Sequence, residues 1–133
     1  MKTVFADRFY YLGLVNPGDG RHSEAVEFSR KLPVCSITTA WVLTEVADAP
    51  AGLMQRGVFL ALLNRLRHDP TVTIVPPSQS LFDRGIELYA RRPDKEWSLT
   101  DSISFVVMHR HGITDALTGD RHFEQAGFTI LLK

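Results

Sequence analysis

The stretch from Trp97 to Phe128, WSLTDSISFVVMHRHGITDALTGDRHFEQAGF, decides the fold and holds two candidate site residues. Ser98 can cap a helix that contains Asp101, and the apolar run from Asp115 to Thr118 predicts a strand that ends just before Asp120. In open α/β sheets, ligands bind in the crevice outside the carboxyl ends of the strands. Asp101 and Asp120 are therefore expected to meet at one end of a sheet.

The rest of the chain shows the same alternation of strand and helix patterns. Short apolar runs alternate with longer segments of helical period, which is typical of βαβ units around a parallel sheet. The predicted strands are Thr3 to Ala6, Val34 to Ile37, Val72 to Val75, Asp115 to Thr118 and Thr129 to Leu132. The predicted helices are Phe9 to Val15, Ser23 to Lys31, one from Thr38 or Thr39 to about Asp48, Leu53 to His68, one from Ser78 or Ser80 to about Arg91, and the one that Ser98 opens. The fold class is therefore α/β.

Length and charge limit what the chain can do. Its 133 residues suffice for one domain with a sizeable core, so we expect a single domain over residues 1–133. The 15 basic and 15 acidic residues cancel. This balance argues against binding long duplexes by charge alone, although local basic patches could still contact a phosphate backbone.

Cysteine usage and the amino terminus indicate the compartment. Cys35 lies in the apolar run LPVCSI, cannot form an internal disulfide, and is expected to be a buried small residue in a reducing cytoplasm. The segment MKTVFADRFYYLGLV carries Asp7 and Arg8 where a signal peptide needs an apolar core, and no apolar run approaches about 18 residues. We therefore expect a cytoplasmic protein without a membrane span.

Four acidic residues follow strands or begin helices in this pattern. Asp7 follows a strand, Glu45 lies about two turns into a helix after a strand, Asp101 is in a helix's first turn, and Asp120 follows a strand. Asp115 is a competing acid on that last strand, but strand alternation and the GDRHF turn favour Asp120. Carboxylates a few ångströms apart repel by roughly 3 to 4 kcal/mol per pair at an effective dielectric of about 20. The pattern therefore predicts a cation, Mg²⁺ or Mn²⁺, of the kind that assists phosphodiester cleavage.

Helix capping is the alternative explanation for three of these acids. Asp7, Asp101 and Asp120 stand where Asp stabilises helix amino termini, and Ser98 with Asp101 has near capping-box spacing. Capping does not account for Glu45, which lies past the first turn of its helix. Independent caps also have no reason to converge from separate segments.

The five histidines form no zinc pattern, because no cysteine partner accompanies them. His22 and His122 begin helices after the Asp7 and Asp120 regions and could approach the rim of the site. For both we expect a packing or hydrogen-bonding role.

These segments carry a resemblance to the PIN domain family, and within it to the VapC-type toxin ribonucleases. VFADRFYYLGLVNPGDGRHSEA is similar to the family's first block, with its aspartate at Asp7. TTAWVLTEVAD is similar to the second block and places its glutamate at Glu45. The stretch from Trp97 to Phe128 is similar to the third and fourth, with their aspartates at Asp101 and Asp120. The resemblance covers nearly the whole chain.

The resemblance implies a fold, an activity and partners. It implies a three-layer α/β/α sandwich with a central parallel sheet, and Mg²⁺ or Mn²⁺ held by Asp7, Glu45, Asp101 and Asp120 as the catalytic and metal-binding residues. It implies endonucleolytic cleavage of single-stranded RNA and a toxin that an antitoxin protein inhibits. It also implies a homodimer, for which the apolar helix faces near Leu53 to Leu66 are candidate contacts.

Two alternative functions remain open on the sequence alone. The family usually has a small hydroxyl residue directly after the first aspartate, and here that residue is Arg8. A catalytically silent PIN-like module that binds RNA or a protein is therefore one alternative. A receiver-like or phosphatase-like domain, in which one aspartate accepts phosphate, is the other.

Overall fold

The computed structural model describes residues 2–31, 34–50 and 52–132, which form one parallel sheet and the helices around it. The strands are β1 (Lys2–Ala6), β2 (Val34–Thr39), β3 (Val72–Val75), β4 (Asp115–Leu117) and β5 (Thr129–Ile130). The helices are α1 (Arg8–Val15), α2 (His22–Ser29), α3 (Ala40–Ala47), α4 (Arg56–His68), α5 (Gln79–Arg91), α6 (Leu99–Arg110) and α7 (Arg121–Gln125).

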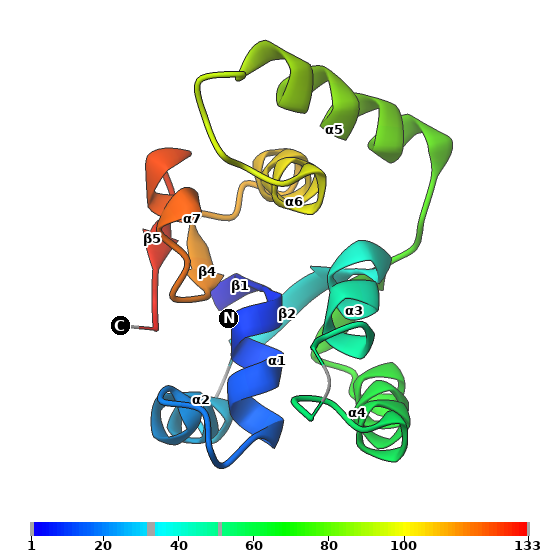
Figure 1. The fold of residues 1–133 in the computed structure, drawn as a ribbon, viewed down its shortest axis with the longest axis vertical. Coiled ribbons are helices and arrows are strands. Elements are labelled where there is room, and N and C mark those ends of the chain that lie inside the picture. Colours follow the sequence, from blue (N-terminus) through cyan, green and yellow to red (C-terminus); the bar gives the residue numbers. More distant parts are fainter. Residues whose placement is uncertain (1, 32–33, 51, 133) are drawn as a thin grey trace.

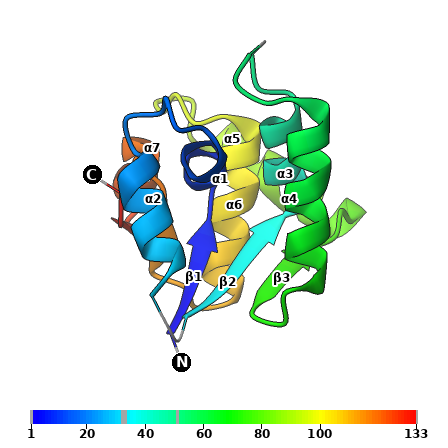
Figure 2. The same cartoon turned by 90° about the horizontal axis from the view of Figure 1, so that it is seen from below.

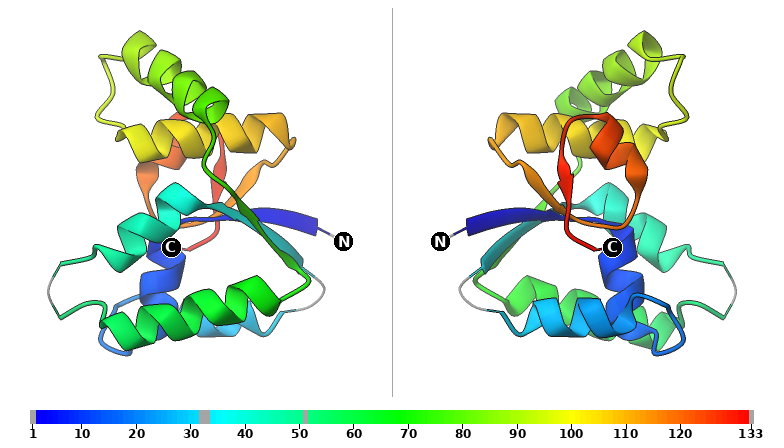
Figure 3. Two further views of the ribbon diagram at one scale, coloured as in Figure 1. Left: turned by 90° about the vertical axis from the view of Figure 1, so that its right-hand side faces the viewer. Right: turned by 90° about the vertical axis from the view of Figure 1, so that its left-hand side faces the viewer.

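The sheet has the strand order β3-β2-β1-β4-β5, and all its pairings are parallel. Figure 2 shows β1, β2 and β3 running in one direction, with α1 starting beyond the end of β1. Helix α6 covers one face of the sheet, with α5 packed on the outer side of α6, and α1, α2 and α4 cover the other face (Figures 1 and 3). The predicted three-layer α/β/α sandwich with a central parallel sheet is confirmed.

Most elements differ from their predicted boundaries by one to three residues; α2, for example, spans His22–Ser29 rather than Ser23 to Lys31. β2 continues through Thr39, because its last residues pair with β3 up to Val75. α4 begins at Arg56 rather than Leu53, because the Leu53 amide donates to the Pro50 carbonyl and closes a turn first. β5 ends at Ile130, two residues before the predicted end.

The expected burial of Cys35 was wrong, because this residue is only half-buried. It lies at the amino end of β2, where all of the first three residues are partly accessible to solvent. The second half of β2 is buried, so the covering helices protect the carboxyl half of this strand.

A cluster of aromatic side chains packs α6 and α7 against the central strand. The Phe105 ring centroid lies 5.0 Å from that of Trp97, 4.9 Å from that of Phe123 and 5.6 Å from that of Phe128. The ring centroids of Phe123 and of Phe5 on β1 lie 6.2 Å apart. Edge-to-face aromatic pairs contribute about 0.5 to 1.5 kcal/mol each beyond their buried area. The segments before β4 and after it are therefore fixed relative to β1.

None of the helices in the described part of the chain has the length and apolar character that a membrane span requires.

A close approach between α5 and α6 gives a test of this packing. A Cβ at Gly85 would lie 2.3 Å from Ile103 Cγ1 and 3.4 Å from its Cα. Because Ile103 is β-branched and fully buried, Gly85→Ala is expected to destabilise the fold by about 1 to 3 kcal/mol. Urea unfolding measures the change.

Gly57 of α4 supplies the matched control. A Cβ there meets nothing within 4 Å, so Gly57→Ala is expected to stabilise the protein by about 0.5 to 1 kcal/mol. Equal effects at the two positions would contradict the tight contact between α5 and α6.

Candidate active site

The site lies where the chain changes direction across the sheet. From β1 the chain proceeds through β2 to β3 at one edge, and it then returns to place β4 on the other side of β1. The Asp7 amide donates to the Leu117 carbonyl at 3.3 Å, which joins the carboxyl ends of β1 and β4. A crevice outside such a switch point is where open α/β sheets bind ligands.

Asp7 follows β1 and is buried. It occupies the position before α1, but its side chain makes no capping bond, so the capping explanation was wrong for this residue. Its Oδ2 instead accepts a hydrogen bond of 3.0 Å from Thr118 Oγ1. Burial raises the pKa of Asp7 to about 7, and the negative charges of Asp101 and Glu45 add to that rise.

Thr118 joins two of the acids. Besides donating to Asp7, its Oγ1 accepts a hydrogen bond of 3.1 Å from the Asp120 amide. The hydroxyl thereby fixes the turn after β4 against the end of β1. By resemblance, Thr118 matches a hydroxyl often found near the fourth acid of the family, although a strand-end threonine needs no function by pattern alone. The structure shows the two contacts that this threonine makes.

Asp101 and Asp120 do act as helix caps. Asp101 Oδ2 accepts from the Ser98 amide at 3.1 Å, and Ser98 Oγ accepts from the Asp101 amide at 3.0 Å, which completes a capping box at α6. Asp120 Oδ1 accepts from the His122 amide at 2.9 Å at the start of α7. A carboxylate offers about four lone-pair sites. Capping therefore leaves both side chains able to bind a further ligand.

Glu45 reaches the same place from α3. Its side chain is partly buried, and burial raises its pKa, as do the charges of Asp101 and Asp120. The charge of Arg8 and a hydrogen bond from Thr100 act in the opposite direction. Arg8 is itself exposed, and its guanidinium lies 5.2 Å from the centre of the Phe9 ring. The residue that departs from the family pattern therefore lies at the margin of the site.

The four acids predicted from the sequence are thus brought into one electrostatic cluster. Burial also raises the pKa of Asp101, and the charge of Asp120 adds to that rise. The hydrogen bonds with Ser98 and the charge of His122 act in the opposite direction. Asp7, Glu45 and Asp101 each have a neighbouring acid among the causes of their raised pKa. A cluster of neighbouring carboxylates is stable only when it binds protons or a cation. Carboxylate oxygens are the donors that Mg²⁺ and Mn²⁺ prefer, and those of Asp101 and Asp120 lie within 4.8 Å of each other, so these residues fit such an ion.

Asp115, the competing acid, lies at the other end of β4. It forms an ion pair with Lys2 of β1, at the amino ends of both strands. Of the two acids, Asp120 is therefore the one that lies at the carboxyl edge of the sheet, as strand alternation predicted.

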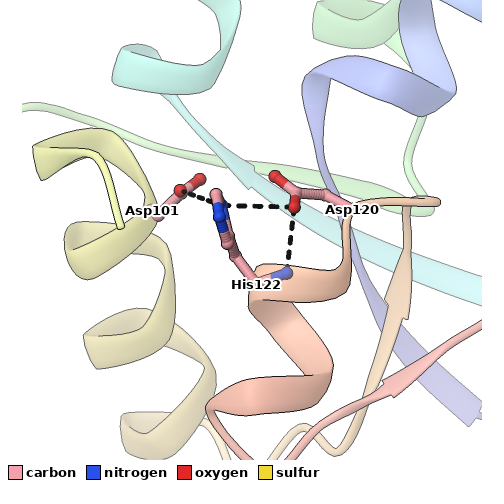
Figure 4. Close-up of side chains that lie close together, drawn as sticks. All are labelled: Asp101, Asp120 and His122. Carbon is pink, nitrogen blue, oxygen red and sulfur yellow. Dashed lines mark hydrogen bonds and ion pairs between the residues drawn. The ribbon is translucent and has the colours of Figure 1, made fainter. Parts of the chain in front are cut away.

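His122 lies closer to the acids than the sequence pattern indicated. Figure 4 shows its ring between Asp101 and Asp120. Its Nδ1 is 3.4 Å from Asp101 Oδ2 and 3.3 Å from Asp120 Oδ1. Spacing links His122 to Asp120 but not to Asp101. His22 has the expected hydrogen-bonding role, since its Nδ1 donates to the Gly13 carbonyl at 2.8 Å.

Arg21 is a neighbour of the site that the sequence pattern did not identify. A Cβ at Gly119 would lie 2.3 to 2.8 Å from the Nε, Cζ and Nη2 atoms of Arg21, so the guanidinium packs directly over this glycine. Its Nε is buried and has no hydrogen-bond partner among the described residues. Gly119 directly precedes Asp120, so this approach brings a fixed positive charge next to the acids.

No family model matches the sequence, whereas a known protein does. The 23S rRNA-specific endonuclease VapC20 of Mycobacterium tuberculosis, from strains CDC 1551 and H37Rv, is 27% identical over 132 residues. The match covers 94% of this chain and 95% of VapC20.

Solved structures give the same result. The crystal structure of Mycobacterium tuberculosis VapC20, a sarcin-ricin loop cleaving toxin, has a TM-score of 0.88 at 27% identity and covers 98% of this chain and 99% of that chain. FitAcB from Neisseria gonorrhoeae shares the fold, with a TM-score of 0.64 at 19% identity. The match covers 98% of this chain and 96% of that chain. The chain is therefore a PIN-like protein that resembles the VapC-type toxin ribonucleases.

Proposed function

We propose that this protein is a metal-dependent endoribonuclease that cleaves single-stranded RNA. The observation that carries the proposal is the convergence of Asp7, Glu45, Asp101 and Asp120 at the switch point of the sheet. The similarity to VapC20, a 23S rRNA-specific endonuclease, supports it over nearly the full length of both chains.

The proposed roles follow from the contacts of each residue. The four acids would hold Mg²⁺ or Mn²⁺, which when bound would activate water and stabilise charge on the phosphate. Thr118 holds Asp7 and the turn before Asp120 in position, and the capping box holds Asp101. Arg8 and Arg21 supply positive charge beside the acids, where a phosphate of the RNA backbone would bind.

A cleavage assay tests the proposal. The tag-free protein is incubated with end-labelled RNA in Mg²⁺ or in Mn²⁺, and in parallel with excess chelator. One RNA is unstructured, and the other contains a sarcin-ricin loop, the element that the relative VapC20 cleaves. We expect discrete products with either ion and none with chelator. Products that persist in chelator, or bound metal without cleavage of either RNA, would count against the proposal.

The second candidate is a catalytically silent RNA-binding or protein-interaction module, and Arg8 is the observation that favours it. A positive charge acting on Glu45 could take the place of part of the metal's charge. Such a module would bind RNA in the same assay without cutting it. The receiver-like alternative has no support, since the matched relative is an endonuclease.

The proposal extends to partners and location. An antitoxin protein that blocks the acid cluster is proposed as the inhibitor, because the similar VapC20 structure is that of a toxin. A cytoplasmic location fits an RNA substrate. A homodimer stays a prediction: of the predicted contact region, Leu62 is buried in the core, whereas Leu53, Val58 and Leu60 remain exposed.

A further inference from the structure

His122 has a position that neither capping nor packing requires. It lies in the first turn of α7 and faces Asp101 on α6 (Figure 4). Its Nδ1 and one carboxylate oxygen each of Asp101 and Asp120 all lie within 4.8 Å of one another. Three potential ligand atoms, from the beginnings of α6 and α7, therefore lie close together.

The Nδ1 atom of His122 is buried and has no hydrogen-bond partner among the residues that the structure describes. Oxygens of Asp101 and Asp120 are near it, yet neither forms a hydrogen bond with it. A buried polar atom left without a partner costs about 1 to 3 kcal/mol. The ring nitrogen is thus directed at the acids without a protein group that satisfies it.

The spacing of these atoms fits ligands of one cation. Two neighbouring ligands of an octahedral ion, each at about 2.1 Å, lie about 3 Å apart. Nδ1 is 3.3 Å from Asp120 Oδ1 and 3.4 Å from Asp101 Oδ2, which is close to that separation for both pairs. A direct N–H···O bond would bring the nitrogen to about 2.9 Å from one of them.

We propose that His122 Nδ1 is a direct ligand of the divalent cation held by the acid cluster, and that it gives the site a preference for Mn²⁺ over Mg²⁺. The inference rests on the proposed function, because it assigns a further ligand to the same site. Mg²⁺ strongly prefers oxygen ligands, whereas transition-metal ions gain affinity from an imidazole. One nitrogen among the acids therefore acts as a selectivity determinant.

The competing explanation is a protonated imidazole that forms ion pairs with Asp101 and Asp120. Both explanations place His122 beside the acids, but they differ once a cation binds. An imidazolium carries no lone pair on Nδ1 and cannot coordinate the ion. Only a ligand nitrogen makes a direct bond to the metal, so the test must detect that bond.

Pulsed electron paramagnetic resonance of bound Mn²⁺ detects a coordinated ¹⁴N nucleus directly. The full chain, without a histidine tag and in a buffer that lacks coordinating nitrogen, is loaded with less than one equivalent of Mn²⁺. We expect ¹⁴N modulation in the wild type and in the control His22→Gln, whose ring bonds to the Gly13 carbonyl instead. The modulation should be absent in His122→Gln. In that variant Mn²⁺ affinity should fall at least about tenfold, and Mg²⁺ affinity by less than about threefold.

The outcomes separate this inference from the proposed function. Mn²⁺ that binds the wild type without ¹⁴N modulation overturns the role of His122 and leaves the acid site standing. Modulation that persists in His122→Gln also overturns it. Failure of the wild type to bind Mn²⁺ at all overturns both the ligand and the metal-dependent function. The wild-type spectrum decides the matter even where a variant fails to fold.

Discussion

Asp101→Asn is expected to lower the rate of RNA cleavage by about a thousandfold or more while leaving the protein folded. Loss of one metal-binding carboxylate removes several kcal/mol of transition-state stabilisation, and each 1.4 kcal/mol is a factor of ten in rate. The measurement is single-turnover cleavage of end-labelled RNA at saturating Mg²⁺. Saturation separates a slower reaction from weaker metal binding.

The asparagine is chosen because it preserves the local structure of α6. Asp101 accepts a hydrogen bond from the Ser98 amide through Oδ2, and the amide oxygen of asparagine can accept the same bond. The substitution removes the negative charge of the side chain and leaves its size nearly unchanged. The circular dichroism spectrum should therefore be unchanged. The melting temperature should be unchanged or higher, since burial disfavours the charged form of Asp101.

Asp115→Asn is the matched control for the loss of a carboxylate. Asp115 lies at the amino end of β4 in an ion pair with Lys2, away from the acid cluster. Because Asp115 takes no part in the acid cluster, this variant should cleave RNA at nearly the wild-type rate. If Asp101→Asn cleaved as fast as Asp115→Asn, Asp101 would have no part in the reaction.

Asp7→Asn is expected to stabilise the metal-free protein at neutral pH. Burial raises the pKa of the Asp7 carboxyl from 3.8 to about 7 in the folded chain. Below pH 4 the group is protonated in both states and has no effect on stability. Between about pH 4 and pH 7 the unfolded chain loses this proton while the folded chain retains it. Stability therefore falls with rising pH, by about 4 kcal/mol once pH exceeds 7.

An asparagine at position 7 carries no charge, so the variant does not lose stability in this way as the pH rises. Its side-chain oxygen can still accept the hydrogen bond from Thr118 Oγ1. The measurement is urea unfolding of both proteins in chelator at pH 4.5 and pH 8. The difference in free energy of unfolding between variant and wild type should grow by a few kcal/mol from the lower pH to the higher.

Added Mg²⁺ or Mn²⁺ supplies the converse test. The cation should stabilise the wild type at pH 8 far more than it stabilises Asp7→Asn, because the variant lacks one of the ligands. The contrary result in the urea experiment is a difference in free energy of unfolding between the two proteins that stays constant with pH. That result would show that Asp7 is charged without cost in the folded state. It would also remove the electrostatic reason for a cation at this site.

The sequence by itself determined the fold class and the residues at the strand ends. The period of the apolar residues is a local property, so it predicted the strands and helices to within a few residues. In a parallel sheet the residues after the strands share one edge, which is why Asp7 and Asp120 could be named together. Glu45 and Asp101 were named from their positions in helices that follow strands, and the family resemblance then assigned all four acids to one site.

Only the tertiary structure decided which side chains meet at that edge. The strand order places β1 beside β4, and this brings Thr118 to Asp7 across 111 residues. No period or spacing along the chain encodes that contact. The same holds for His122 beside Asp101 and for Arg21 over Gly119, which come from segments that the sequence leaves unconnected. Contacts between distant segments depend on how the helices pack on the sheet, so their chemistry appears only once the chain has folded.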